Sequence, residues 1–467
     1  DAGIAAALVV GSLAAVSVLA PGKHLSPDTA VMTAGVRSCW VPENHQLHEA
    51  DRREVPEPRE TESADRPNIL LIVNESLGTH ELELTGDRVD QMPYLQKWIR
   101  RAPSQFVRFR HAYANSTSTD LSVPSMLTGV GPYRPVDHLH EMPLIWDWAR
   151  AAGLSPFYVS AQNYSATNFP EFFFEDDPMP IFTPNSLEGR SGDDFALDEL
   201  VAAEKFDEML SDVPEDRPFF AVYNSNAMHK PFQQRSRLLD QQPRRGTPYR
   251  NAMYVLDRAL KRIIESIRRE GRLEDTIVIM TSDHGEYVDR RHKVPRILSL
   301  YEEFIRVPML MRIPEKWRNR RAEAVAGLET NRERNVTNLD IVPTVVDILG
   351  YDRVEAAAPL RDKLSGHSLL EPVPPGRTII AINNNAIRHW EHQGFGIFWK
   401  DWRFVFTDIE GPRLFDIAED PHQKNDLWEQ APAPVRNHVL ETIRDNKFLD
   451  EMWTSYQTGT KRPRAAE

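Results

Sequence analysis

Short, uninterrupted apolar runs recur through the middle of this chain and limit the folds open to it. The first, NILLIVNE at 68–75, lacks the apolar–polar alternation of a half-exposed strand and is typical of a strand buried on both faces. Similar runs occur at 156–160, 218–224, 276–283 and 307–313. Helical patterns lie between them; in 251–271 the apolar residues share one face, and Gly271 suits a C-terminal cap. This alternation predicts an α/β sandwich with a mostly parallel central sheet flanked by helices.

The first part of the chain has a different character. Residues 3–20 form an uncharged apolar run that, at about 1.5 Å per residue, is almost long enough to cross a hydrocarbon layer. Three interpretations stay open: the last transmembrane helix of a membrane enzyme, a signal-peptide core, and a buried alanine-rich helix. No basic residue precedes the run, which weakens the signal-peptide interpretation. We expect 1–22 to be an apolar helix left from a membrane anchor, and the charge-dense 23–66 to be a linker that is either a tether or held on the surface.

A proline-rich stretch, EPVPPGR, marks a boundary beyond residue 370. Four short apolar runs separated by turns follow it, and they predict a small antiparallel sheet, then a C-terminal helix and a polar tail. We therefore expect a catalytic domain at 67–375, a C-terminal subdomain at 376–450 and a tail at 451–467.

Composition narrows the chemistry. The formal net charge of −13 argues against nucleic-acid binding, which needs a basic surface. Cys39 is the only cysteine, so an intrachain disulfide and a cysteine-based metal cluster are both excluded. Any metal must be held by oxygen and imidazole ligands.

Polar residues follow two of the predicted buried strands, where ligands bind in open α/β sheets. One strand ends in Asn74-Glu75, and another runs into Asp283-His284-Gly285. Adjacent Asp and His side chains offer an oxygen and a nitrogen to one metal, and a carboxylate from another strand completes a set suited to zinc, with manganese or calcium as alternatives. The simpler interpretation makes Asp283 a capping residue and His284 a surface histidine.

The third segment is rich in hydroxyl groups: NSTSTDLSVPSMLTG at 115–129. Because proline is tolerated in the first turn of a helix, Pro124 predicts a helix that begins near Thr119 to Ser122. Backbone N–H groups at a helix start attract anions, and a metal lowers the pKa of a neighbouring hydroxyl so that it becomes a nucleophile. The alternative is a cluster of Ser and Thr that only caps the helix.

In combination and in this order, the three segments resemble the alkaline phosphatase/sulfatase superfamily, and most of all its membrane-anchored phosphoethanolamine transferases and lipoteichoic acid synthases. The resemblance spans roughly 68–427 and includes TNLDIVPTVVDILG and RLFDIAEDPHQKNDL, which are similar to segments found widely in sulfatases. It implies an alkaline phosphatase-like fold. It also implies that the nucleophile is Thr119, five residues before the Pro of S-V-P, and that the metal ligands are Glu75, Thr119, Asp283 and His284.

Two departures separate this chain from the sulfatase branch. Sulfatases use a Cys or Ser in C/S-x-P-x-R that is converted to formylglycine, whereas S-V-P-S-M lacks the arginine. Sulfatases also usually carry paired aspartates where this chain has Asn74-Glu75. Both differences favour the transferases. Phosphoethanolamine transferases, however, usually hold several disulfides, whereas this chain can form none, so the identity of the transferred headgroup stays open.

Two histidines are further catalytic candidates. His229, in NSNAMHKPF, resembles the histidine with which relatives bind the phosphate or a second metal. His292, in VDRRHKVP, lies about as far beyond the Asp-His pair as another histidine in relatives. Each also has the simpler interpretation of a polar loop residue. Basic residues beside them suit a phosphate: Lys230, Arg290, Arg291 and Lys293. Asn163, near another strand end, receives no role.

The resulting hypothesis is a two-step displacement on a phosphate ester. Thr119 attacks phosphorus to give a phosphothreonine, and an alcohol or water then accepts the group, with His229 or His292 as proton donor or acceptor. The partners implied are a phosphate- or sulfate-ester substrate and, if 1–22 spans the cell membrane, a lipid and an extracytoplasmic catalytic domain. Two alternatives stay open: a phosphodiesterase, phosphonate hydrolase or sulfatase-like hydrolase on the same site, and an inactive superfamily member that acts as a binding module.

Overall fold

The computed structural model describes residues 50–58, 66–79, 92–164, 169–174, 179–186, 197–230, 232, 247–286, 299–383 and 394–459. The predicted apolar helix at 1–22, His292, and the basic residues Arg290, Arg291 and Lys293 lie outside these ranges. Within them, no helix combines the length and the hydropathy that a membrane span requires.

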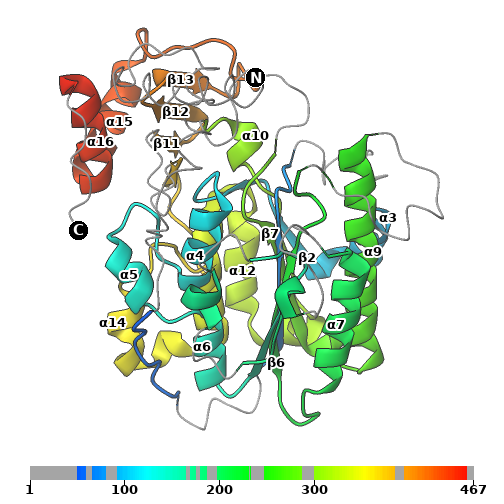
Figure 1. The fold of residues 1–467 in the computed structure, drawn as a ribbon. Helices are drawn as coiled ribbons and strands as arrows, with labels where there is room; N and C mark the ends of the chain where they lie inside the picture. Colours follow the sequence, from blue (N-terminus) through cyan, green and yellow to red (C-terminus); the bar gives the residue numbers. More distant parts are fainter. Residues whose placement is uncertain are drawn as a thin grey trace, which may run out of the picture.

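A seven-stranded sheet forms the centre of the molecule, in the order β2-β8-β7-β1-β6-β4-β5 (Figure 1). Five neighbouring strands, β7 to β5, are parallel, whereas β8 is antiparallel to both β7 and β2. The strands are β1 (Asn68–Asn74), β2 (Phe106–Phe109), β4 (Ser155–Ser160), β5 (Ile181–Phe182), β6 (Phe219–Ser225), β7 (Thr276–Ser282) and β8 (Met309–Arg312). The predicted, mostly parallel sheet is confirmed. A separate parallel pair joins β3 (His111–Tyr113) to β9 (Asn335–Thr337).

Alternate residues of the buried strands supply two hydrophobic cores, one on each face of the sheet. In β1, Leu71 enters one core and Leu70 the other. One face is covered by α3 (Pro93–Arg101), α7 (Glu199–Ser211) and α9 (Pro248–Arg269). The other is covered by α4 (Thr119–Thr128), α5 (Val136–Glu141), α6 (Ile145–Ala151), α12 (Ala322–Thr330), α13 (Ile341–Ile348) and α14 (Ala358–Arg361). Two short helices, α10 (Glu302–Ile305) and α11 (Glu315–Arg320), flank β8 in the chain. The helix predicted at 251–271 is α9, and Gly271 just after it has a φ of +70°.

The hydroxyl-rich segment at 115–129 begins a helix as predicted, but Pro124 does not lie where the prediction placed it. The helix α4 starts at Thr119, so Pro124 is its sixth residue and lies in the second turn. At that position the missing proline N–H costs the helix one internal hydrogen bond. The proline therefore does not mark the first turn.

The C-terminal subdomain is a four-stranded antiparallel sheet in the order β10-β11-β12-β13, as predicted. Its strands are β10 (Thr378–Ile382), β11 (Gly394–Trp399), β12 (Trp402–Thr407) and β13 (Gly411–Asp416). The helices α15 (Ala433–Asp445) and α16 (Lys447–Thr458) follow. The predicted boundary at 450 falls inside α16, because Leu449, Met452 and Trp453 are buried against the subdomain. A bridge between Ser116 and Ile382 joins the sheet to the chain just before α4.

Part of the predicted linker lies against the domain that contains the seven-stranded sheet. Arg52 donates to the carbonyls of Leu139, Met142 and Phe172, and its guanidinium lies 4.5 Å from the centre of the Phe172 ring. Residues 50–58 are therefore held on the surface beside α5.

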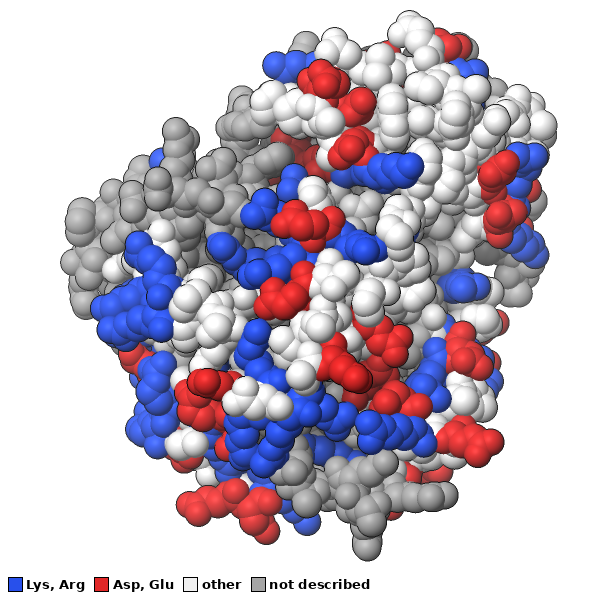
Figure 2. All heavy atoms as spheres, turned by 180° about the vertical axis from the view of Figure 1, so that it is seen from behind, with Lys and Arg blue, Asp and Glu red and all other residues white. Residues whose placement is uncertain are grey.

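Charges of both signs lie side by side on the face shown in Figure 2. Surface ion pairs also join helices, as between Arg262 of α9 and Glu204 of α7 at 2.8 Å. Such exposed pairs stabilise a fold little.

One buried ion pair connects the C-terminal sheet to α10, which follows β7 of the seven-stranded sheet in the chain. Arg403 of β12, 1% exposed, pairs with Glu302 of α10 and donates to the Tyr113 hydroxyl. We expect Arg403→Ala to lower the free energy of unfolding by about 3 kcal/mol, the low end of the cost of breaking a buried pair, because the buried Glu302 would lose its shortest ion pair while its contact with Arg306, at 3.7 Å, stays. Urea denaturation measures the loss, and Arg262→Ala, which breaks the exposed pair with Glu204, should cost less than about 1 kcal/mol. Equal losses in the two variants would contradict this expectation.

Candidate metal centre

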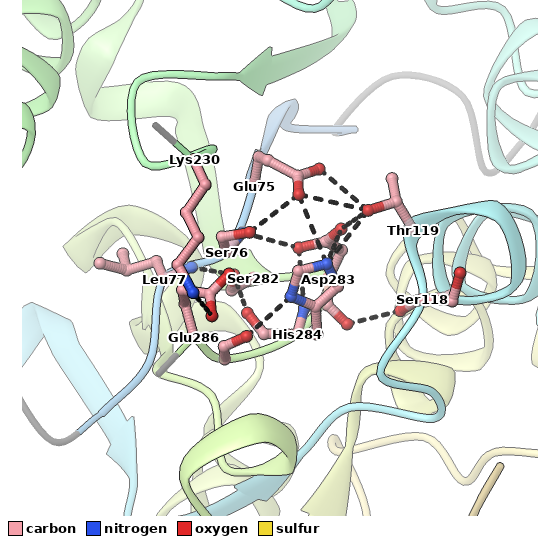
Figure 3. Close-up of polar contacts among 12 residues, drawn as sticks. Glu75, Ser76, Leu77, Ser118, Thr119, Lys230, Ser282, Asp283, His284 and Glu286 are labelled. Carbon is pink, nitrogen blue, oxygen red and sulfur yellow. Dashed lines mark hydrogen bonds and ion pairs between the residues drawn. The ribbon is translucent and has the colours of Figure 1, made fainter. Parts of the chain in front are cut away.

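Polar side chains from three chain segments meet where β1 and β7 end. The two strands are neighbours, with Asn74 paired to Ser282, so Glu75 and Asp283 emerge side by side. Both carboxylates are buried, as is His284. Thr119, the first residue of α4, points into the same space (Figure 3).

The Thr119 hydroxyl oxygen lies within hydrogen-bonding distance of the other three side chains. It is 2.8 Å from Asp283 Oδ2, 3.1 Å from His284 Nε2 and 3.1 Å from Glu75 Oε2. His284 Nε2 is 3.4 Å from Glu75 Oε1 and 3.3 Å from Asp283 Oδ2. The ligand atoms of the two carboxylates and the imidazole all lie within 4.8 Å of one another.

These separations fit a tetrahedral cation site. Four ligands about 2.0–2.1 Å from a zinc ion are about 3.3 Å from each other. The measured separations, 2.8 to 3.4 Å, are close to that value. Three oxygens and one imidazole nitrogen also form the mixed set that zinc accepts.

The hydrogen-bond inventory of the site points to the same conclusion. His284 Nδ1 lies 2.8 Å from the Gly285 carbonyl, which only accepts, so Nδ1 carries the proton and Nε2 presents a lone pair. The Thr119 hydroxyl has one proton for three acceptors: two carboxylates and this nitrogen. A cation satisfies all of these lone pairs at once.

Electrostatics supply a further reason for a cation. Burial and, to a lesser extent, the nearby Glu75 carboxylate raise the pKa of Asp283 from 3.8 to about 7, against the lowering effect of His284. Two buried carboxylates repel each other unless a proton or a cation lies between them. A divalent ion removes this repulsion, because the ligands then bind in their deprotonated forms.

Backbone groups hold Asp283 in place. Its Oδ1 accepts from the N–H groups of Ser76, at 3.0 Å, and His284, at 2.7 Å, which leaves Oδ2 facing Thr119. Gly285 lies so close to α10 that a Cβ atom there would be 2.2 Å from the Glu303 carbonyl oxygen. Only glycine therefore fits after His284.

His229 and Lys230 follow β6, the strand on the other side of β1. Among the described residues, no hydrogen bond joins the His229 imidazole to Thr119 or to the three ligands. Lys230 instead pairs with the buried Glu286 at 2.8 Å (Figure 3). Asn163 lies beyond β4, beside Tyr164, whose hydroxyl accepts from Asn224 at 2.7 Å.

Sequence reasoning missed Glu199, which supports the segment that carries His229. This carboxylate, 2% exposed, accepts from the Tyr223 hydroxyl and from the N–H groups of Asn226 and Ala227. Burial raises its pKa to about 7, against the opposing effect of these three donors. No motif marks Glu199, because its partners follow a strand more than twenty residues later in the chain.

We expect Glu199→Gln to make the free energy of unfolding less dependent on pH. A carboxyl whose folded pKa is raised from 4.5 to about 7 binds more protons in the native state across that window, so stability falls as pH rises through it. At about 1.4 kcal/mol per pKa unit, the wild type should lose on the order of 2–3 kcal/mol more than the variant between pH 5 and 8. Urea unfolding at both pH values measures this, with the exposed Glu204→Gln as control. Identical pH profiles for wild type and Glu199→Gln would contradict the expectation.

Comparison with known proteins yields one family model, described as Sulfatase, which matches residues 67–351. The uncharacterized sulfatase YidJ of Escherichia coli K12 is 25% identical over 213 residues, which cover 43% of this chain and 38% of that protein. Choline-sulfatase of Rhizobium meliloti is 27% identical over 192 residues, covering 41% and 34%. Arylsulfatase K of Canis lupus familiaris is 30% identical over 195 residues, covering 38% and 32%. The chain thus spans about a third of the length of these relatives.

Solved structures show the same fold. Ps i-CgsB in complex with k-i-k-neocarrahexaose has a TM-score of 0.63 at 17% identity, and the match covers 85% of this chain and 98% of that chain. The zinc complex of the C-terminal periplasmic domain of EcEptC from Escherichia coli has a TM-score of 0.53 at 16% identity, covering 72% and 96%. Sequence identity this low establishes the architecture alone.

Proposed function

The chain belongs to the sulfatase family, and from this premise we propose that it is a metal-dependent enzyme that cleaves phosphate esters with Thr119 as nucleophile. One observation carries the proposal: the Thr119 hydroxyl oxygen lies within 3.2 Å of Glu75, Asp283 and His284. These three residues and Thr119 would hold the cation, with zinc as our first choice. The zinc complex of the EcEptC domain, whose fold this chain shares, supports that choice.

The chemistry follows from what the side chains do. When bound, a divalent cation lowers the pKa of an adjacent hydroxyl and neutralises charge on the ester oxygens. Thr119 releases its hydroxyl proton to solvent and attacks phosphorus, the bond to the leaving oxygen breaks, and the enzyme carries a phosphothreonine. A second alcohol or water then takes the group and restores the Thr119 hydroxyl. His229 is our candidate for protonating the leaving oxygen, and His292 is the alternative.

The choice between phosphate and sulfate rests on the residues of α4. By the resemblance to C/S-x-P-x-R, Ser122 stands where sulfatases carry their converted residue, but Met126 replaces the arginine. The Ser122 hydroxyl donates its proton to the backbone carbonyl of Asp283 at 2.6 Å, so this hydrogen bond engages it. Thr119 faces the ligands instead. An unmodified hydroxyl nucleophile favours phosphate esters.

Sulfate-ester hydrolysis is the second candidate, because choline-sulfatase and arylsulfatase K are among the relatives. A phospholipid headgroup is the substrate class that we propose if residues 1–22 anchor the chain in the cell membrane, with the catalytic domain on its extracytoplasmic side. The periplasmic origin of the EcEptC domain agrees with that arrangement.

Assays of purified protein with nitrophenyl phosphate monoesters, diesters and sulfates test this proposal. We expect turnover of a phosphate ester that chelation abolishes and zinc or manganese restores. Turnover of the sulfate alone would favour the second candidate. Tight metal binding without turnover of any ester would favour an inactive binding module.

A further inference from the structure

A buried asparagine connects the helix that carries Thr119 to a metal ligand. Asn338 follows β9, is fully buried, and uses both ends of its amide. Its Oδ1 accepts from the N–H group of Asn115 at 3.0 Å and from the side chain of Asn115 at 2.9 Å. Its Nδ2 donates to the Ser122 hydroxyl oxygen at 3.2 Å.

Ser122 passes this connection on to the metal centre. Because its oxygen accepts from Asn338, its proton is left for the Asp283 carbonyl, to which it donates at 2.6 Å. Ser122 is three residues after Thr119, so both lie on the same side of α4. The hydrogen bonds from Asn338 to Ser122 and from Ser122 to the Asp283 carbonyl therefore hold the start of α4, which carries Thr119, at a fixed distance from the Asp283 backbone.

The start of α4 lacks part of the anchoring that helices usually have. The N-cap residue, Ser118, makes no side-chain capping bond, and Pro124 removes a backbone donor in the second turn. The Asn115 side chain, itself bonded to Asn338, donates to the Ser122 carbonyl at 3.2 Å. Side-chain hydrogen bonds that converge on Asn338 thus replace part of the anchoring that a helix usually supplies itself.

We propose that Asn338 is a positioning residue that holds the Thr119 hydroxyl in register with the metal ligands, acting through Ser122. The role rests on the function proposed above. It requires a donor toward Ser122 and an acceptor toward Asn115, and only an amide of this length offers both.

The test compares Asn338→Ala with Asn331→Ala. Asn331 is equally buried and makes side-chain hydrogen bonds with Leu369, Glu371 and Val373, none of which belongs to the metal centre. Both variants should lose stability. Only Asn338→Ala should lower kcat, by about 10- to 100-fold per folded enzyme, because small misplacements of a nucleophile are costly. KM should stay within about threefold of wild type, and zinc should still bind, since Glu75, Asp283 and His284 stay in place.

Two further measurements distinguish a positioning role of Asn338 from a general loss of stability. Adding Ser122→Ala to Asn338→Ala should lower kcat no further, because both act on one path. Amide exchange at Leu121 and Ser122, which donate to the Ser118 carbonyl, should accelerate at least about tenfold in Asn338→Ala and not in Asn331→Ala. Should Asn338→Ala not fold, Asn338→Asp, which keeps the acceptor and loses the donor, takes its place with the same expectations.

An unchanged kcat in Asn338→Ala would overturn the proposal. So would a double variant whose loss of kcat equals the product of the losses in Asn338→Ala and Ser122→Ala. Amide exchange needs no substrate, so it decides the matter even if the wild type turns over none of the esters. Faster exchange with no turnover would reject the proposed function and keep the anchoring role of Asn338, whereas unchanged exchange would reject that role.

Discussion

Replacing Thr119 with alanine should lower kcat by at least about 10³-fold while leaving the fold and the metal in place. The substitution removes the hydroxyl that lies within 3.2 Å of the side chains of all three residues, Glu75, Asp283 and His284, and with it the atom that would form the covalent bond. The three remaining ligands still hold a cation. Steady-state kinetics, metal content and thermal unfolding of the same preparation measure the three effects.

Neighbouring hydroxyl groups provide the controls. Thr119→Ser keeps the reacting oxygen and should retain most of the activity. Ser118→Ala removes the hydroxyl one residue away, which makes no capping bond to α4, and it should turn over substrate at close to the wild-type rate. Near-normal turnover by Thr119→Ala, together with loss of activity in Ser116→Ala, would show that the nucleophile is misassigned.

Asp283→Asn should abolish metal binding and yet stabilise the metal-free protein. In the wild type without metal, burial and the Glu75 carboxylate raise the pKa of Asp283 to about 7, so its charge is unfavourable at pH 8. An amide removes that charge and keeps the acceptor for the N–H groups of Ser76 and His284. Since the cost appears as pH rises from 3.8 to about 7, the advantage of the variant should be largest at pH 8 and shrink toward pH 5.

Unfolding with and without zinc measures both halves of this prediction. With zinc at about a thousand times its Kd, the wild type should gain about 4 kcal/mol of unfolding free energy, and the variant should gain almost none. Asp257→Asn is a suitable control, because Asp257 is equally buried but accepts from the N–H groups of Tyr94 and Leu95, far from the ligands in the chain. An Asp283→Asn protein that is still stabilised by zinc as strongly as the wild type would show that the metal lies elsewhere.

The sequence predicted the architecture wherever a strand is long and buried on both faces. The strands β1, β6 and β7 are continuous apolar runs, so their order of appearance with intervening helices indicates a parallel sheet. The strands β2, β3, β5 and β9 were not predicted, because segments of two to four residues carry no periodicity of their own. Their pairing depends on the strands beside them. The end of α16 was missed because the burial of Trp453 depends on the C-terminal sheet.

The residues of the candidate site also fall into those that the sequence predicts and those that it does not. Glu75, Asp283 and His284 follow long strands, and neighbouring parallel strands end at one edge, so their meeting can be expected from the order of the chain. Thr119 enters through a recognisable hydroxyl-rich helix start. Asn338 and Glu199 have no such signal, since each acts on groups that only tertiary packing brings to it.

Anomalous diffraction at the zinc absorption edge, from crystals grown with zinc, tests the metal centre most directly. We expect a peak at coordination distance from Glu75, Asp283 and His284, with the Thr119 oxygen as its fourth neighbour. A zinc ion bound elsewhere in the chain, with no peak among these four side chains, would contradict the account.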